Sequence, residues 1–166
     1  LLVLTGNPKT GVSNDAIISS LKAIRKELGE KLVLVAGKMH SSGTAGEASS
    51  RIVDKKTIND FIEAGADIIL IPAPGTVPGI TLEFVKAMTD FVHSKGKMVL
   101  TTIGTSQEGA SVETIRQIAL MCKMAGADMH HIGDTGFFGM AVPENIFEYS
   151  KTIRGVRHTY RRMAMK

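Results

Sequence analysis

Two related segments decide the fold of this chain: Ala64-Gly65-Ala66-Asp67-Ile68-Ile69-Leu70-Ile71 and Ala125-Gly126-Ala127-Asp128-Met129-His130-His131-Ile132. Each has a small-residue stretch and an aspartate before a mainly apolar run, and a glycine follows each run, at Gly75 and Gly136. This pattern is typical of a helix end that leads into a buried parallel strand and then into a glycine turn. The spacing between the copies spans two strand–helix units, so the sequence predicts a fold built by repetition.

The rest of the chain alternates between strand-like and helix-like segments. Amphipathic helices are expected from Asn14, from near Thr57, from Thr81, after Ser111 and after Pro143, because apolar residues recur there every three or four positions. Strands are expected at about 1–5, 31–37, 67–72, 97–103 and 128–133. This alternation predicts an α/β protein with a parallel sheet.

Two parallel folds match five such units. A flavodoxin-like open parallel sheet has five strands and about this length, whereas a (β/α)8 TIM-type barrel needs ~250 residues. The two-unit repeat and the long loops after the strands favour a partial barrel of about five β/α units, and no G-x-G-x-x-G fingerprint follows the first strand. The chain also opens inside a strand without a methionine. We therefore expect residues 1–166 to be a single domain, the C-terminal portion of a barrel with its upstream units missing.

Composition narrows the class of protein. An apolar content of 43% with 22% charged residues is ordinary for a globular domain, and no apolar run is long enough for a membrane helix. The single cysteine excludes an internal disulfide and is typical of a reducing compartment, so a cytoplasmic location is expected. An incomplete barrel leaves two unpaired strand edges, which favours a homo-oligomer.

Several loop motifs resemble those of a known family. The matching segments are Thr5–Pro8, Ala36–His40, Ile103–Glu108, His131–Asp134 and Pro143–Tyr160. They resemble uncharacterised bacterial (β/α)8-barrel proteins that often carry the label haloacid dehalogenase-like hydrolase. The resemblance implies the C-terminal part of a barrel over the whole chain. Haloacid dehalogenases need an Asp-x-Asp motif, which this sequence lacks, so a haloacid dehalogenase activity is not expected.

A more distant similarity links residues 127–136 and Pro143-Glu144 to a strand end of the metal-dependent aldolase and acyl-synthase barrels. The sequence has no His-x-His pair of the kind that binds metal in those enzymes. This resemblance alone therefore does not lead us to expect the same metal in this chain.

Function in a barrel is located at the carboxyl ends of the strands, and this rule selects the candidate residues. Lys38 follows the second strand and could form a Schiff base or bind an anion, with His40 pointing the same way if the strand continues. An exposed loop lysine is the alternative. His131 and Asp134 belong to the densest polar cluster on any strand. Asp134 could act as a base beside His131, or the two could ligate a divalent metal, or the histidines could be structural.

Glu108 ends a polar loop after the fourth strand and is a candidate acid or base. The predicted catalytic residues are therefore Lys38, Glu108, His131 and Asp134. Glycine turns offer backbone N–H groups to a phosphate, and nearby hydroxyl and amide groups offer hydrogen bonds, although loop geometry or helix capping would explain the same residues. The predicted substrate-binding residues are Asn7, His40, Gly75, Thr105, Ser106, Gln107, Gly133, Thr135 and Gly136.

These residues together suggest a metabolic enzyme of lyase or isomerase type that acts at a carbonyl of a small anionic or phosphorylated metabolite. The alternative is a non-catalytic or regulatory barrel that binds a ligand. A third hypothesis is nucleic-acid binding through the basic segment 151–166, where Arg154, Arg157 and Arg161 fall on one stripe. Aromatic residues make up only 5% of the chain and no nucleic-acid-binding motif is present, so a nucleic-acid partner is not expected.

Overall fold

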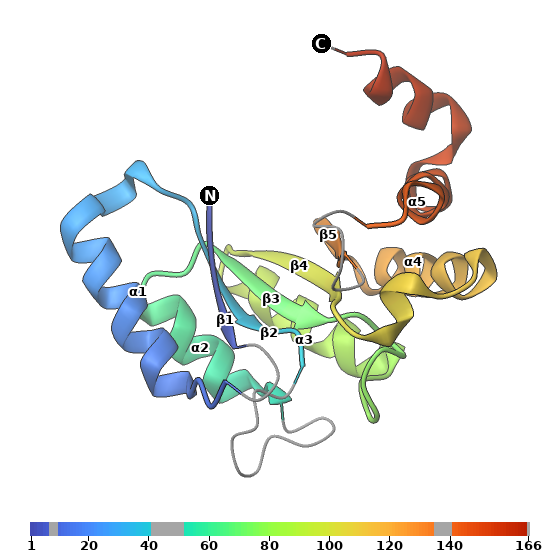
Figure 1. The fold of residues 1–166 in the computed structure, drawn as a ribbon. Helices are drawn as coiled ribbons and strands as arrows, with labels where there is room; N and C mark the ends of the chain where they lie inside the picture. The colour runs from blue at the N-terminus through green and yellow to red at the C-terminus, as the bar shows by residue number, and fades with distance from the viewer. Residues whose placement is uncertain (7–9, 41–51, 135–140, 166) are drawn as a thin grey trace.

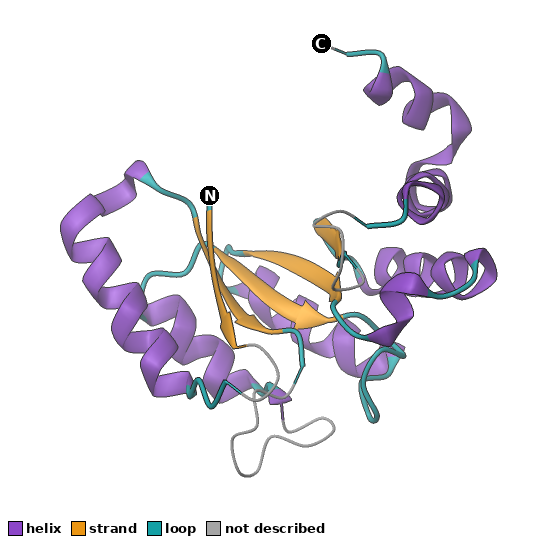
Figure 2. Ribbon diagram, viewed as in Figure 1, coloured by secondary structure: helices purple, strands orange, loops and turns teal. Residues whose placement is uncertain are grey.

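The computed structural model describes residues 1–6, 10–40, 52–134 and 141–165. The strands in this part are β1 (Leu2–Gly6), β2 (Leu34–Lys38), β3 (Ile68–Pro72), β4 (Met98–Ile103) and β5 (Met129–Ile132). The α-helices are α1 (Asn14–Leu28), α2 (Lys55–Glu63), α3 (Leu82–Ser94), α4 (Val112–Ala125) and α5 (Pro143–Met163), with short 3-10 turns η1 (Gly29–Lys31) and η3 (Ser106–Gly109). Strands and helices alternate along the chain, as the sequence predicts (Figure 2).

The strand order distinguishes the two predicted folds. The strands form one five-stranded sheet in the order β1-β2-β3-β4-β5, and every neighbouring pair is parallel (Figure 1). A flavodoxin-like sheet places its second strand at the edge, in the order 2-1-3-4-5. A sequential parallel order is that of a (β/α)8 barrel. The partial TIM-type barrel is therefore confirmed, and the flavodoxin-like alternative is wrong.

The sheet is apolar on both faces. The larger core lies between the sheet and the helices, where Leu34, Ile69 and Ile71 pack with Leu21 and Phe61. The opposite face carries a smaller cluster of Val35, Ile68, Leu70 and Leu100. Residues 68–71 alternate between these two clusters, because successive side chains of a strand point to opposite faces. A run that is apolar throughout is thus explained by burial on both sides.

The repeated aspartates fasten the amino ends of the strands. Asp67 donates its backbone N–H to Leu34 O, and its Oδ2 accepts the Leu34 N–H, both at 2.9 Å. Asp128 forms the same pair of bonds with Val99, at 3.1 and 2.8 Å. Each aspartate therefore holds its own strand against the preceding one. The repeat recognised in the sequence has a structural role at the amino end of the sheet.

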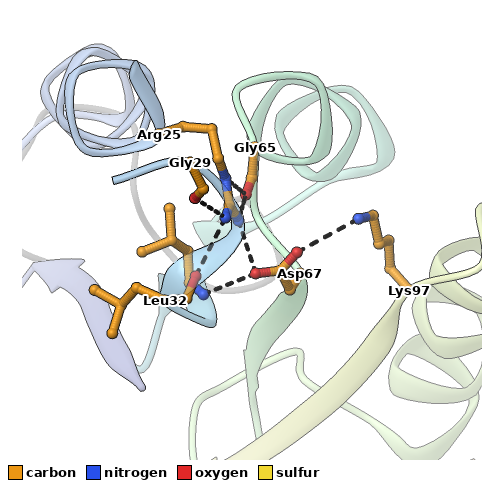
Figure 3. Close-up of polar contacts among 7 residues, drawn as sticks. Arg25, Gly29, Leu32, Gly65, Asp67 and Lys97 are labelled. Atoms are coloured by element: carbon orange, nitrogen blue, oxygen red, sulfur yellow. Dashed lines mark hydrogen bonds and ion pairs between the residues drawn. The ribbon is translucent and has the colours of Figure 1, made fainter. Parts of the chain in front are cut away.

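Each aspartate also pairs with a basic side chain from a helix. Arg25 Nη2 lies 2.7 Å from Asp67 Oδ2, while its other nitrogens donate to the carbonyl groups of Gly29, Leu32 and Gly65 (Figure 3). In the second copy, His93 Nε2 lies 2.8 Å from Asp128 Oδ2. The arginine therefore ties α1, the turn before β2 and the turn before β3 into one network.

The last helix differs from the sequence-based expectation. The spacing of Ile146, Tyr149, Ile153, Val156, Tyr160 and Met163 after Pro143 predicts one continuous amphipathic helix. Tyr149 and Ile153 pack against the core, as this spacing predicts, but the continuous helix is wrong. Gly155 has φ 80° and ψ 163°, which breaks the helix into two parts that point in different directions (Figure 1). Val156, Tyr160 and Met163 lie beyond the break and are 54%, 56% and 67% exposed. The glycine therefore directs the end of α5 away from the sheet.

None of the helices in the described residues combines the length and the apolar character that crossing a bilayer requires.

The Asp67 network predicts a pH-dependent loss of stability. Burial raises the pKa of Asp67, but the Leu34 N–H and the Arg25 guanidinium outweigh it and hold the pKa below its ordinary value. The ionised form is therefore favoured by folding, and its contribution is present above about pH 4 and disappears as the pH falls through the lower folded-state pKa. We expect Asp67→Asn to cost about 1–3 kcal/mol at pH 7 and much less at pH 3, measured by urea denaturation.

Asp60→Asn is the matched control, because Asp60 pairs with an exposed Lys56 on the surface of α2. It should cost less than about 0.5 kcal/mol at either pH. Equal costs for the two variants at pH 7 would contradict the role given to Asp67.

Candidate functional site

A polar cleft lies at the carboxyl ends of β2, β4 and β5. Its volume is about 470 Å³. This is the end of a parallel barrel at which active sites are found. The residues that line it are Met39, His40, Gly104, Glu108, His131, Ile132, Gly133, Asp134 and Ala141. Three predicted catalytic residues, Glu108, His131 and Asp134, thus meet in one cleft.

Glu108 reaches this cleft from the loop after β4. It lies on η3, and its carboxylate packs directly over the backbone of Gly133 at the end of β5. A methyl group added at Gly133 would overlap Glu108 Oε2. Only glycine therefore admits the carboxylate at this position. The sequence suggests a phosphate turn at Gly133, whereas the structure shows a site of close approach for a side chain.

Asn145 holds this loop through hydrogen bonds to its backbone. The sequence did not identify this residue as part of the site. Its side chain is 4% exposed, and its Nδ2 donates to Glu108 O at 3.3 Å and to Ala110 O at 3.0 Å. The first turn of α5 thereby fixes the backbone of η3 beside β5. From the sequence alone, an asparagine near the start of a helix cannot be assigned to this role, because a helix cap would explain it equally well.

His131 is anchored by the neighbouring strand. Its Nδ1 lies 2.8 Å from the hydroxyl oxygen of Thr102, which is fully buried on β4. Burial lowers the pKa of His131, and the negative charge of Asp134 only partly opposes this shift. The imidazole is therefore neutral near pH 7.

His130 occupies the other face of β5. Its Nδ1 lies 3.0 Å from the hydroxyl oxygen of the buried Tyr149, and the two rings are in tilted contact. This histidine is a hydrogen-bonded part of the layer between β5 and α5. The structural alternative therefore fits His130.

Lys38 does not line the cleft. It shares a face of β2 with Leu34 and Ala36, which pack toward the helices, and its Nζ donates to Val12 O at 2.9 Å in the loop before α1. β2 ends at Lys38, so the strand does not continue to bring Lys38 and His40 to the same side. Lys38 therefore does not lie beside His40 at the cleft, and the alternative of an exposed loop lysine is also wrong, because Lys38 is fully buried. His40 alone of the two lines the cleft.

The polar loop after β4 is divided between two hollows. Thr105 donates its hydroxyl to Gln107 Oε1 and contacts Thr76 O at 3.2 Å, and the Ser106 hydroxyl lies 3.5 Å from Gln107 Oε1. Gln107 lines a neighbouring hollow of about 730 Å³ together with Gly75. These predicted substrate-binding residues therefore lie outside the cleft that contains Glu108. Asn7, Thr135 and Gly136 fall outside the described residues.

The metal hypothesis gains no support from the donor set. Within residues 1–6, 10–40, 52–134 and 141–165, no group of three or more His, Cys, Asp or Glu side chains is placed to hold a metal ion. His131 and Asp134 alone do not make a divalent-metal site.

Fold and site together define a partial parallel (β/α) barrel with a cleft lined by carboxylate and imidazole side chains. The chain belongs to a family described as a domain of unknown function, DUF7916, whose model matches residues 1–166. No curated protein matches the sequence.

Solved structures show the fold. The tetrameric deoxyribose phosphate aldolase from Aeropyrum pernix has 14% sequence identity to this chain and a TM-score of 0.59, and the match covers 93% of this chain and 71% of the aldolase. This similarity establishes a TIM-barrel-like α/β architecture and nothing about the reaction. Neither the family nor this structure supports a haloacid dehalogenase label.

The contact between Glu108 and Gly133 predicts a specific coupling. Gly133→Ala should destabilise the protein by about 1–3 kcal/mol, because the new methyl group displaces the carboxylate. In a Glu108→Ala background the same change should cost far less. A double-mutant cycle measured by thermal and urea unfolding tests this, and additive costs would contradict the contact.

Proposed function

We propose that this protein is a cytosolic metabolic enzyme of lyase or isomerase type that moves a proton next to a carbonyl group of a small, oxygen-rich metabolite. The observation that carries the proposal is the meeting of Glu108, His131 and Asp134 in one cleft at the carboxyl ends of parallel strands. Two carboxylates and a neutral imidazole are the groups that general acid–base chemistry requires.

The chemistry follows from these groups. A carboxylate removes a proton from the carbon beside the carbonyl, and the resulting negative charge moves onto the carbonyl oxygen. A hydrogen-bond donor near that oxygen stabilises the charge. In an isomerase, the electron pair then forms a new bond to hydrogen, with the proton returned by the protonated carboxyl group. In a lyase, the base instead takes the proton of the hydroxyl group on the departing carbon. The carbon–carbon bond breaks, that carbon leaves as a carbonyl compound, and the enolate formed on the other fragment takes up the proton. Glu108 and Asp134 are the proposed proton carriers.

The charge of the cleft constrains the substrate. Its described lining contains two carboxylates and neither lysine nor arginine, so a phosphate group is disfavoured there. The reacting end of the substrate is therefore proposed to be uncharged. For an anionic or phosphorylated metabolite, we place the charged group in the neighbouring hollow, where the side-chain amides of Gln107 and Gln117 offer N–H donors. Thr105 links the two loops, since its hydroxyl contacts Thr76 O.

The open sheet supports a proposal about the whole domain. β1 and β5 each pair with one strand in the described residues, and Leu2 and Val3 on β1 are 37% and 41% exposed. An eight-stranded barrel has no such edges. We propose that residues 1–166 are one domain that forms the C-terminal portion of a barrel, with further β/α units beside these edges. A homo-oligomer is the second means of covering them.

Proton exchange provides a test that does not depend on the identity of the natural substrate. A panel of small hydroxyaldehydes and hydroxyketones is incubated with the protein in D2O, and loss of the proton beside the carbonyl is followed by NMR. We expect catalysed exchange for at least one compound. Glu108→Gln and Asp134→Asn should lower its rate about 100-fold or more.

Glu113→Gln is the matched control, because Glu113 is exposed in the first turn of α4, away from the cleft. It should leave the rate unchanged, and circular dichroism should show that all variants are folded. Exchange no faster than in buffer across the panel, or equal rates in all variants, would overturn the proposal.

A further inference from the structure

The hydrogen bond between Thr102 and His131 indicates which nitrogen of the histidine ring carries the proton. The two residues are direct partners in the parallel pairing of β4 and β5. The backbone of Thr102 is held on its other side, because its carbonyl accepts the Ala73 N–H at 2.8 Å. The hydroxyl oxygen lies 2.8 Å from His131 Nδ1. Strand pairing therefore fixes both members of the bond.

A buried hydroxyl must donate its hydrogen to an acceptor or lose the free energy of a hydrogen bond. Thr102 is 0% exposed, and within the described part of the chain its hydroxyl has one hydrogen-bond partner, His131 Nδ1. If Nδ1 carried a proton, the hydroxyl would accept it and its own hydrogen would have no acceptor. Both groups have a hydrogen-bond partner when the Thr102 hydroxyl donates its hydrogen to an unprotonated Nδ1 of His131.

The preceding pair of residues on the same two strands shows the contrast. The hydroxyl of Thr101 lies 3.4 Å from His130 Nδ1, but it also lies 3.4 Å from the carbonyl oxygen of Met129. That hydroxyl can donate to the carbonyl, so it does not determine which nitrogen of His130 is protonated.

We propose that Thr102 holds neutral His131 as the tautomer with its proton on Nε2, so that His131 presents an N–H donor to a ligand in the cleft. Thr102 is a positioning residue, since it acts through the ring and does not line the cleft. The neutral state is consistent with the lowered pKa of His131 that burial produces.

This assignment adds a role for His131 to the proposed function. The class of ligand inferred below rests on that proposed function. Nδ1 is turned to Thr102, so Nε2 is the nitrogen of His131 that faces a ligand. An Nε2–H donor requires an oxygen acceptor, and the two carboxylates require a hydrogen to remove. The ligand class that satisfies both is a hydroxy-carbonyl compound, with its carbonyl oxygen on His131 and an adjacent C–H toward Glu108 or Asp134. His131 is thereby the donor that stabilises the developing charge, and it is not the base.

Long-range ¹H–¹⁵N NMR of the histidine rings, recorded near neutral pH without any ligand, tests the tautomer directly. The spectrum of the wild type should show His131 protonated on Nε2. Thr102→Val keeps the shape of the buried side chain but removes the hydroxyl, and should give a mixture of tautomers. Thr102→Ser retains the hydroxyl and should restore the wild-type pattern. Thr101→Val is the control and should leave the His131 signals unchanged.

A wild-type ring protonated on Nδ1, or an unchanged tautomer in Thr102→Val, would overturn the assignment. The proton-exchange assay on the same variants separates this result from the proposed function. If both hold, Thr102→Val lowers kcat about tenfold or more with little change in KM, and Thr102→Ser restores it. If the tautomer shifts while the protein catalyses no exchange, the proposed function fails and the role of Thr102 stands.

Discussion

Parallel pairing between strands that are adjacent in sequence is the constraint on which the rest of this structure depends. It directs every strand the same way, so the loops that follow β2, β4 and β5 meet at one end of the sheet. It also sets the register in which Thr102 faces His131. A shift of one residue would turn each of these side chains to the opposite face of the sheet. The chemistry proposed for the cleft is therefore a consequence of strand register.

Stability and chemistry are placed at opposite ends of the strands. Asp67 and Asp128 bond to the backbone at the amino ends, each beside a basic side chain from a helix, and fasten neighbouring strands together. Figure 3 shows this arrangement at Asp67. The cleft at the carboxyl ends is built from loops, which hold Glu108 over Gly133. Because the aspartate network lies away from the cleft, the loops can vary while the sheet is retained.

Interactions between distant side chains limited what the sequence could predict about the site. Glu108, His131 and Asp134 were identifiable, because each lies at or just after the carboxyl end of a predictable strand. Lys38 is the last residue of β2, yet its side chain points to the helix side, where its ammonium group donates to Val12 O. The sequence did not show which face of the sheet this lysine takes. The partnership of His93 with Asp128 was likewise hidden, since the two are 35 residues apart.

The sequence by itself determined the alternation of strands and helices, the parallel sheet and the end of it where polar side chains gather. These features depend on local periodicity, on glycine and proline positions and on the repeated Ala-Gly-Ala-Asp segment. Only the tertiary structure decided which polar residues share the cleft, that Gly155 turns the end of α5 away, and that Thr102 anchors His131. Those outcomes depend on register, on backbone angles and on contacts between residues far apart in the chain, none of which the local pattern of residues encodes.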